Sequence, residues 1–323
     1  MIFGPVCLPL GTMNSKEPSN NKHKHVLITG CSSGFGLFSA VDAAQAGFTV
    51  TATMRNLNKK HLLQAAIEKH NLNIDIQQLD VTDPESINTL VNQIKRVDIL
   101  INNAGILITG SFLDQTDEEM RKIFETNYFG AVNLTRAVTP AMIEQKSGRI
   151  INIASLAGLV GHPFNAAYAA SKHAIIGFSK SIRIELAPFG IHVVSIEPGY
   201  HRTEIIGANA YQSENFYDRS SPMFSLNRGF LRTMFDEILP RAGDPQAVAD
   251  VILKAMTAEK PKNDYIIGKD ARFAATLHWL GMGPWLSRKV MRIIKRNARL
   301  ENQREADKKA RRKQKHKNPA DSG

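Results

Sequence analysis

The chain has 323 residues, 43% of them hydrophobic, which is enough to bury a full core as one α/β domain with tails or as two small domains. It has no run of 18 or more apolar residues, which excludes a membrane-spanning helix at the level of sequence. The start lacks the basic segment and cleavage site of a signal peptide, and two cysteines make no disulfide framework. These features predict a cytoplasmic protein.

The net charge of +11 is concentrated near the C-terminus. Residues 288–318 hold 14 Lys and Arg against three acidic residues, so this segment carries the whole excess. The rest of the chain is neutral, which argues against a basic nucleic-acid-binding domain.

Short runs rich in Val, Ile and Leu alternate with helix-length segments along the chain. The helix-length segments include 58–70 and 84–95. The predicted strands are 26–29, 49–54, 74–79, 97–101, 149–154 and 192–196, with a weaker one at 265–267. This alternation predicts an α/β fold, a Rossmann-like doubly wound parallel sheet with helices on both faces and a C-terminal helical extension.

The first predicted strand runs into the glycine-rich stretch TGCSSGFG, residues 29–36. In such a sheet the first strand-to-helix turn faces the crevice where dinucleotides bind. Glycine lets the backbone approach a pyrophosphate, but a turn that needs positive φ selects it too. The spacing of Gly30, Gly34 and Gly36 is neither GxGxxG nor a Walker A loop, so these eight residues leave both interpretations open.

Residues further along decide between them. Asn102-Asn103-Ala104-Gly105 ends the fourth strand, Ser155 ends the fifth, and Tyr168 and Lys172 follow 13 and 17 residues after Ser155. Together with TGxxxGxG, this order resembles the short-chain dehydrogenase/reductase family, in its branch with domains of about 250 residues. The resemblance covers roughly residues 24–270. It implies that a nicotinamide dinucleotide is held by the glycine turn: Gly30, Ser32, Ser33, Gly34, Phe35 and Gly36.

Tyr168 and Lys172 stand four residues apart in a helix-length segment, where side chains at this spacing share a face about 5 to 6 Å apart. Tyr265 and Lys269 have the same spacing in a predicted strand, where they would lie roughly 13 Å apart. Only in the first pair can the ammonium act on the phenol. A free tyrosine has a pKa of about 10. The positive charge of the Lys172 ammonium, together with that of an oxidised nicotinamide, favours the phenolate form of Tyr168.

Tyr168 is therefore predicted to be the general acid in ketone reduction and the base in the reverse direction. Ser155 would donate a hydrogen bond to the carbonyl oxygen, where charge develops during hydride transfer. The resemblance implies that Lys172 also holds the nicotinamide ribose and that Asn127 completes a proton relay through water. The alternatives are a strand-end serine at Ser155 and a helix-bending asparagine at Asn127.

The resemblance also implies cofactor contacts in loops that follow strands. Asp80, with Val81 beside it, matches the residue that contacts adenine, although Asp80 can instead cap a helix. The sequence PGYHRT over residues 198–203 matches the family's PGxxxT segment and puts Thr203 near the carboxamide, with His201 as a loop residue. The predicted contacts are completed by Asn103, Ala104, Gly105, Tyr168, Lys172, Pro198 and Gly199. No metal site is predicted.

The end of the second strand predicts which nicotinamide cofactor binds. An acidic side chain there suits the ribose 2′-hydroxyl of NAD, and an arginine suits the 2′-phosphate of NADP. Met54 stands where the acid would be and Arg55 follows, which favours NADP(H) over NAD(H). The glycine loop has no basic residue, so Arg55 is the chief selector.

The strings ITGCSSGFG, GLVGHPFNAAY and IEPGYHRTE resemble the hydroxysteroid and retinol dehydrogenase branch. A predicted lid, residues 204–239, holds eight aromatic or methionine residues: Tyr211, Phe216, Tyr217, Met223, Phe224, Phe230, Met234 and Phe235. Such a lid suits an apolar pocket, although it must also pack on its own domain. We expect an NADP(H)-dependent oxidoreductase of a lipophilic, steroid-, retinoid- or lipid-like alcohol or ketone. The alternatives are a 3-oxoacyl or polyol substrate, and a binding protein that senses NADP without turnover.

The segment 273–300 contains Trp279 and Trp285, then an amphipathic pattern of apolar Leu286, Val290, Ile293 and Ile294 among basic residues. Such a helix can lie on an anionic membrane, as in a peripheral membrane protein, or dock on the domain or on a second subunit of the homo-oligomer that we expect. Non-specific RNA contact is a further alternative, and no specific nucleic acid is predicted.

These features divide the chain into four predicted segments. Residues 1–23 are a flexible N-terminal segment, 24–270 the NADP-binding domain, 271–300 the amphipathic basic extension, and 301–323 a disordered basic tail.

Overall fold

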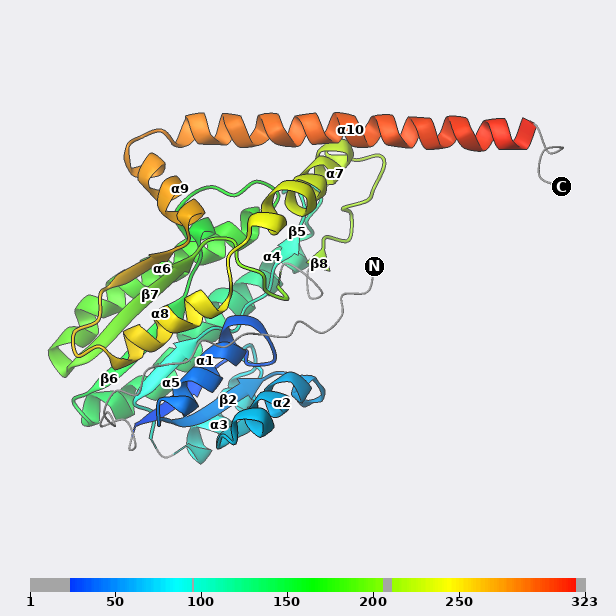
Figure 1. The fold of residues 1–323 in the computed structure, drawn as a ribbon. Coiled ribbons are helices and arrows are strands. Elements are labelled where there is room, and N and C mark those ends of the chain that lie inside the picture. Colours follow the sequence, from blue (N-terminus) through cyan, green and yellow to red (C-terminus); the bar gives the residue numbers. More distant parts are fainter. Residues whose placement is uncertain (1–23, 95, 206–210, 318–323) are drawn as a thin grey trace.

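The structure, a computed structural model, describes residues 24–94, 96–205 and 211–317 (Figure 1). The predicted flexible segment 1–23, with Cys7, lies outside the described residues. Seven parallel strands form one sheet in the order β3-β2-β1-β4-β6-β7-β9. They are β1 (His25–Ile28), β2 (Thr49–Met54), β3 (Ile74–Gln78), β4 (Ile99–Asn102), β6 (Gly148–Ile153), β7 (Ile191–Pro198) and β9 (Asp264–Ile267). The predicted doubly wound α/β fold is confirmed, and each predicted strand end lies within two residues of the observed one.

Helices cover both faces of the sheet, because alternate strand residues point to opposite sides. Val26 and Ile28 pack on the face covered by α1 (Gly34–Gln45), α2 (His61–His70) and α8 (Gln246–Thr257). Leu27 packs on the other face, with α3 (Pro84–Gln93), α5 (Gly130–Glu144) and α6 (Ala166–Leu186). Both sides of each central strand are therefore buried, which is why these strands read as continuous apolar runs.

Two short strands were not predicted. β5 (Ile108–Thr109) pairs in parallel with β8 (Tyr211–Gln212), which ties the predicted lid segment to the loop after β4. Strands of two residues carry no periodicity, so sequence patterns do not reveal them. The lid continues through α7 (Phe224–Thr233) and a π-helical turn over Met234–Ile238, while α4 (Asp117–Phe124) runs into a second π turn at Glu125–Phe129.

The C-terminal extension is docked on the lid. α9 (Lys269–Trp279) leads into α10 (Gly283–Lys317), which lies across α7 (Figure 1). Gly229 of α7 allows the close approach, since a Cβ there would lie 2.6 Å from the Ile294 carbonyl oxygen. Ile294 is fully buried against Phe230 and Met234. The docking alternative for this helix is therefore the one that the structure shows.

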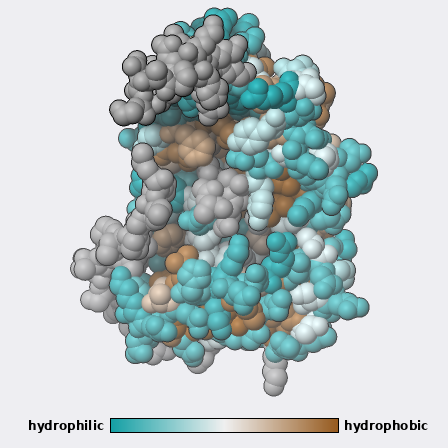
Figure 2. Space-filling model, turned by 90° about the vertical axis from the view of Figure 1, so that its right-hand side faces the viewer, coloured by the Kyte–Doolittle hydropathy of each residue, from teal (hydrophilic) through white to brown (hydrophobic). Residues whose placement is uncertain are grey.

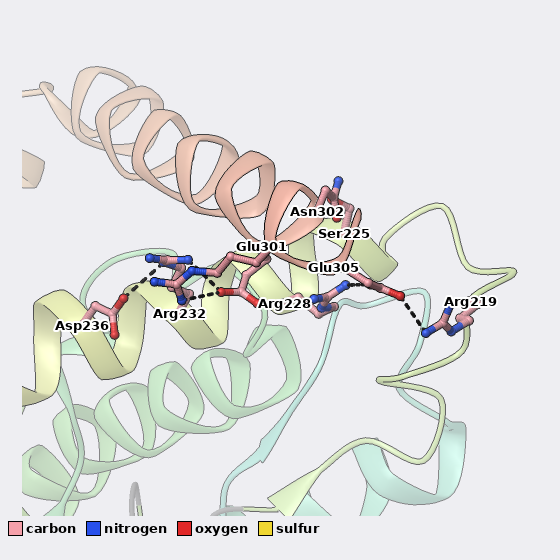
Figure 3. A network of polar contacts seen from close by, with 9 residues as sticks. Arg219, Ser225, Arg228, Arg232, Asp236, Glu301, Asn302 and Glu305 are labelled. Atoms are coloured by element: carbon pink, nitrogen blue, oxygen red, sulfur yellow. Dashed lines mark hydrogen bonds and ion pairs between the residues drawn. The ribbon is translucent and has the colours of Figure 1, made fainter. Parts of the chain in front are cut away.

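Ion pairs extend this contact past residue 300 (Figure 3). Glu301 accepts from Arg232 at 2.8 Å and Arg228 at 3.3 Å, and Glu305 pairs with Arg228 and, at 2.8 Å, with Arg219. The prediction of a disordered tail from residue 301 is wrong for this stretch, because acidic residues in a basic segment meet arginines of the lid. Within the described residues, no helix is both long and apolar enough to cross a membrane.

Candidate active site

The glycine turn joins β1 to α1 and bends back on itself. Gly30 and Gly34 have positive φ values of 73° and 57°, a region that side chains with a Cβ rarely adopt. A Cβ on Gly36 would lie 2.4 Å from the Gly30 carbonyl oxygen, so this position excludes any side chain. The N-cap residue Ser33 makes no side-chain hydrogen bond to α1. The turn therefore presents the start of a helix without a capping side chain, which is where a phosphate group binds.

The loop after β4 packs against this turn, at the place where the strand order reverses between β1 and β4. Thr29 Oγ1 accepts hydrogen bonds from the backbone N–H groups of Asn103, at 3.0 Å, and Ala104, at 2.9 Å. The Asn103 amide in turn donates to the carbonyl oxygens of Thr29, at 2.8 Å, and Gly30, at 3.1 Å. The Asn103 side chain thus joins the two loops, a role that the sequence analysis did not include.

Arg55 and Asp80, two of the predicted cofactor contacts, follow β2 and β3. Arg55 is exposed at the end of β2, whereas Met54 is only 2% exposed and packs in the core. The carboxylate of Asp80 accepts hydrogen bonds from the backbone and hydroxyl of Thr82, at 2.9 and 2.7 Å. The helix-cap alternative for Asp80 is wrong, because Asp83 caps α3.

Ser155, Tyr168 and Lys172 come together at the carboxyl ends of β4 and β6. Lys172 Nζ lies 5.7 Å from the centre of the Tyr168 ring and donates a 2.8 Å hydrogen bond to the Ile153 carbonyl oxygen. Ser155 Oγ accepts from the backbone N–H of Ala157 at 3.1 Å and is within hydrogen-bonding reach of the Tyr168 hydroxyl. Tyr265 and Lys269, which have the same four-residue spacing, lie on different elements: Tyr265 lies in β9, and Lys269 begins α9.

Burial dominates the electrostatics of this group. It raises the pKa of Tyr168, and the hydrogen bond with Ser155 lowers it in part. Burial also lowers the pKa of Lys172 to about 8, so the lysine is mostly protonated at neutral pH. A protonated phenol beside an ammonium is an arrangement that can give up a proton and stabilise the phenolate left behind.

Asn127 lies in the π turn between α4 and α5, so the helix is distorted at this residue, as in the helix-bending alternative. Its amide oxygen accepts from the Ile106 N–H at 2.8 Å, and its nitrogen donates to the Ile106 carbonyl and to Ser171 Oγ. Gly105 separates Asn127 from Lys172, since a Cβ there would lie 3.2 Å from Asn127 Oδ1 and 3.7 Å from Lys172 Nζ. The structure thus brings Asn127 and Lys172 close to the same glycine.

A cavity opens in front of Ser155 and Tyr168, with about 960 Å³ of empty space up to and including its mouth. Four of the eight aromatic and methionine residues of the predicted lid line it: Tyr211, Phe230, Met234 and Phe235. Others do not, because Phe216 is fully buried and Tyr217 is 57% exposed. Pro198, Gly199, Thr203 and Phe35 line the cavity too. Figure 2 shows hydrophobic residues in a recess of the surface below the end of α10.

The sequence analysis missed a chain of polar side chains along the cavity wall. Thr109 Oγ1 donates to Asn165 Oδ1 at 3.1 Å, Asn165 Nδ2 donates to His162 Nδ1 at 3.0 Å, and His162 Nε2 is hydrogen-bonded to the Tyr200 hydroxyl. All four residues line the cavity. In the sequence these residues are visible only as members of the strings GHPFN and PGYHR. Neither string indicates that His162 and Tyr200 come into contact.

The chain matches the family model for short chain dehydrogenases over residues 24–213, and it belongs to this family. It is 38% identical over 245 residues to retinol dehydrogenase 8 of Bos taurus, a match that covers 73% of this chain and 78% of the relative. The protein is thus an oxidoreductase of the dehydrogenase/reductase type.

Solved structures agree. A short-chain dehydrogenase from Streptomyces avermitilis is similar with a TM-score of 0.70 and 36% identity, over 83% of this chain and 98% of that one. A short-chain dehydrogenase from Sphingobium yanoikuyae, determined in complex with NADPH, has a TM-score of 0.62 and 25% identity, over 78% and 92% of the two chains.

Proposed function

We propose that this protein is an NADP(H)-dependent dehydrogenase/reductase of a lipophilic alcohol or ketone. The observation that carries the proposal is the meeting of Ser155, Tyr168 and Lys172 at one end of a largely apolar cavity. A sensor of NADP without turnover would not need a phenol, a hydroxyl and an ammonium converging on one point.

The bound nicotinamide supplies or accepts the hydride. The Ser155 oxygen already accepts from the Ala157 N–H, so the hydroxyl proton, which is within reach of Tyr168, is the group that donates to the substrate oxygen. Tyr168 gives its proton to that oxygen in reduction and takes it back in oxidation. Lys172 stabilises the phenolate through its charge, and Asn127 completes a proton relay through water, as the family resemblance implies.

NADP(H) is favoured over NAD(H) by Arg55. The guanidinium is exposed at the end of β2, and among the described residues no carboxylate forms a salt bridge with it. A 2′-phosphate would supply that partner in a charge-assisted pair. The similar Sphingobium yanoikuyae enzyme was determined with NADPH, which supports the same choice.

A lipophilic substrate is favoured by the cavity wall. Phe35, Leu107, Phe230, Leu231, Met234 and Phe235 contribute to it. A polyol would leave most of its hydroxyl groups without partners against this surface, at a cost that disfavours binding. The similar retinol dehydrogenase 8 is named for a lipophilic alcohol.

The test is consumption of NADPH, followed by absorbance, with matched ketones of increasing apolar area. We expect kcat/KM to rise with apolar area and to exceed the value with NADH. Equal rates with a polyol-derived ketone would contradict the substrate class, and no turnover with any carbonyl would favour the sensor.

We also propose that the corner between α9 and α10 contacts an anionic membrane surface. The predicted membrane-facing residue Ile294 is buried under α7, but five large apolar side chains at the corner are exposed: Phe273 (54%), Trp279 (84%), Leu280 (56%), Met282 (41%) and Trp285 (42%). Residues 271–300 contain seven Lys and Arg and no acidic residue, and Lys289 Nζ lies 5.2 Å from the centre of the Trp285 ring. Exposed tryptophans beside basic side chains suit the interface of an anionic bilayer, where each Lys or Arg contributes about 1 kcal/mol.

Vesicle co-sedimentation separates this from a contact with a second subunit. The chain should sediment with phosphatidylserine vesicles at low salt and not with neutral phosphatidylcholine. Trp279→Ala with Trp285→Ala should release it, whereas Ile184→Ala, which removes a 77% exposed apolar side chain on α6, should not. If the parent chain does not bind vesicles but forms dimers, and the double variant does not form dimers, the corner is a subunit interface instead.

A further inference from the structure

The polar chain on the cavity wall ends in a hydroxyl group whose proton has no assigned use. Burial lowers the pKa of His162 to about 4, so the ring is neutral at pH 7 and carries one N–H. His162 Nδ1 lies 3.0 Å from Asn165 Nδ2 and 3.3 Å from the carbonyl oxygen of the adjacent Pro163. The shorter contact makes Nδ1 the acceptor of the Asn165 amide proton, so the ring proton is assigned to Nε2, which donates to the Tyr200 oxygen. The Tyr200 O–H proton is therefore left over. With the ring proton on Nε2, no acceptor for the Tyr200 proton is recorded among the described residues.

The Tyr200 hydroxyl group is a hydrogen-bond donor held in one place. Its partner His162 is fixed by Asn165, which is 4% exposed and also accepts from Thr109. The loop between His162 and Asn165 is strained at Phe164, whose φ of 62° is rare for a bulky residue, and Phe164 stacks on Phe230 with ring centres 5.0 Å apart. Strain kept in a rigid cavity wall indicates a loop selected for placing side chains.

Tyr200 also lies near the reacting group. It follows the end of β7, lines the same cavity as Ser155 and Tyr168, and is close enough to Tyr168 for a charge on one phenol to raise the pKa of the other. Burial is the main cause that raises the pKa of Tyr200, and the Asp270 carboxylate and Tyr168 add to the rise, so Tyr200 remains a protonated donor. A ligand oxygen beside the reacting carbonyl is the acceptor that this geometry fits.

We propose that the Tyr200 hydroxyl, oriented by His162, donates a hydrogen bond to a second oxygen of the substrate, so that the site selects lipophilic ketones with a neighbouring carbonyl or hydroxyl group. The effect on turnover rests on the proposed function, but the hydrogen bond from Tyr200 can also be detected by measuring ligand binding alone. Tyr200 would touch the substrate, and His162 is a positioning residue that acts through it.

The experiment compares 1-phenylpropane-1,2-dione with propiophenone, which lacks the second oxygen. Dissociation constants for both are measured in the NADP⁺ complex, where no hydride is available, and kcat/KM for both is measured with NADPH. Tyr200→Phe should weaken binding of the diketone about tenfold more than binding of the monoketone, and should lower the ratio of their kcat/KM values by the same factor. His162→Leu should act in the same direction, and His162→Gln, which retains an N–H donor, should restore part of the preference.

The control is Tyr217→Phe, which removes a hydroxyl from an exposed lid residue outside the cavity wall and should change neither ratio. If Tyr200→Phe changes both ketones by one factor, in binding and in turnover, the second-oxygen site does not exist. If the diketone preference in binding depends on Tyr200 but no ketone is reduced, the site stands and the proposed function fails.

Discussion

Lys172 Nζ lies 5.7 Å from the centre of the Tyr168 ring and is anchored on the Ile153 carbonyl oxygen at 2.8 Å. The lysine is thus held by the end of β6, the same strand end that Ser155 follows. One turn of α6 and one strand end therefore position all three groups, so the geometry of the site depends on two rigid elements rather than on the lid.

Tyr168→Phe removes only the hydroxyl that transfers the proton. We expect kcat for ketone reduction to fall by about 100-fold or more, with NADPH affinity changed less than about twofold. Steady-state kinetics and fluorescence titration measure the two. Tyr265→Phe is the matched control, because its hydroxyl lies outside the site and accepts from the Lys262 N–H at 3.1 Å. Normal turnover in Tyr168→Phe would refute the mechanism.

Arg55→Ala should weaken NADPH binding by about 10-fold to 100-fold, the loss of one charge-assisted contact, and change NADH binding little. Titration of both cofactors measures this. Arg121→Ala, on the exposed side of α4, should affect neither. Equal losses for NADPH and NADH in Arg55→Ala would mean that the arginine has a structural role. Because Met54 is buried, Met54→Asp would place a charge in the core and is a poor test of cofactor choice.

Gly36→Ala should disrupt the glycine turn, since the new Cβ would lie 2.4 Å from the Gly30 carbonyl oxygen. We expect a loss of about 1 to 3 kcal/mol in the free energy of unfolding and at least tenfold weaker NADPH binding. Gly177→Ala is the control: no atom lies within 4 Å of its Cβ position on α6, and it should stabilise the fold by about 0.4 to 1 kcal/mol. Unchanged cofactor affinity in Gly36→Ala would show that the turn does not hold the cofactor.

Ketone reduction should lose rate above about pH 8, because the buried Lys172 ammonium then loses its proton. The pKa of Lys172 in the folded protein is below its ordinary value of 10.5, so burial of the ammonium opposes folding at neutral pH. As pH rises from about 8 to 10.5, this penalty is lost and the free energy of unfolding increases. A pH profile of kcat/KM measures the first effect. In Lys172→Arg, whose charge persists, this alkaline decline should disappear; its survival would assign the decline to another group.

Glu301→Ala should lower the free energy of unfolding by about 1 to 2 kcal/mol, since Arg228 and Arg232, both largely buried, lose their shared partner (Figure 3). Because α7 carries Phe230 and lies on the cavity wall, the KM for a lipophilic ketone should rise as well. Denaturant unfolding and steady-state kinetics measure these. Glu259→Ala, at an exposed position outside any recorded ion pair among the described residues, should change stability by less than about 0.5 kcal/mol.

Sequence alone determined the sheet, the glycine turn and the Tyr168–Lys172 pair. Each depends on a local pattern: apolar strands alternate with helices, and glycines stand where a Cβ cannot fit. A spacing of four residues brings side chains together on a helix, as in Tyr168 and Lys172, but not in a strand, as in Tyr265 and Lys269.

Only the tertiary structure decided which amphipathic face was free and which polar groups meet. Ile294 is buried because Gly229, 65 residues earlier, leaves room for α10, and the basic tail is ordered at Glu301 because arginines of α7 face it. Likewise, His162 meets Tyr200 across 38 residues of chain, and the Asn103 amide closes on Gly30 from another strand. Such contacts depend on how packed elements are arranged in space, and no local spacing or periodicity carries that information.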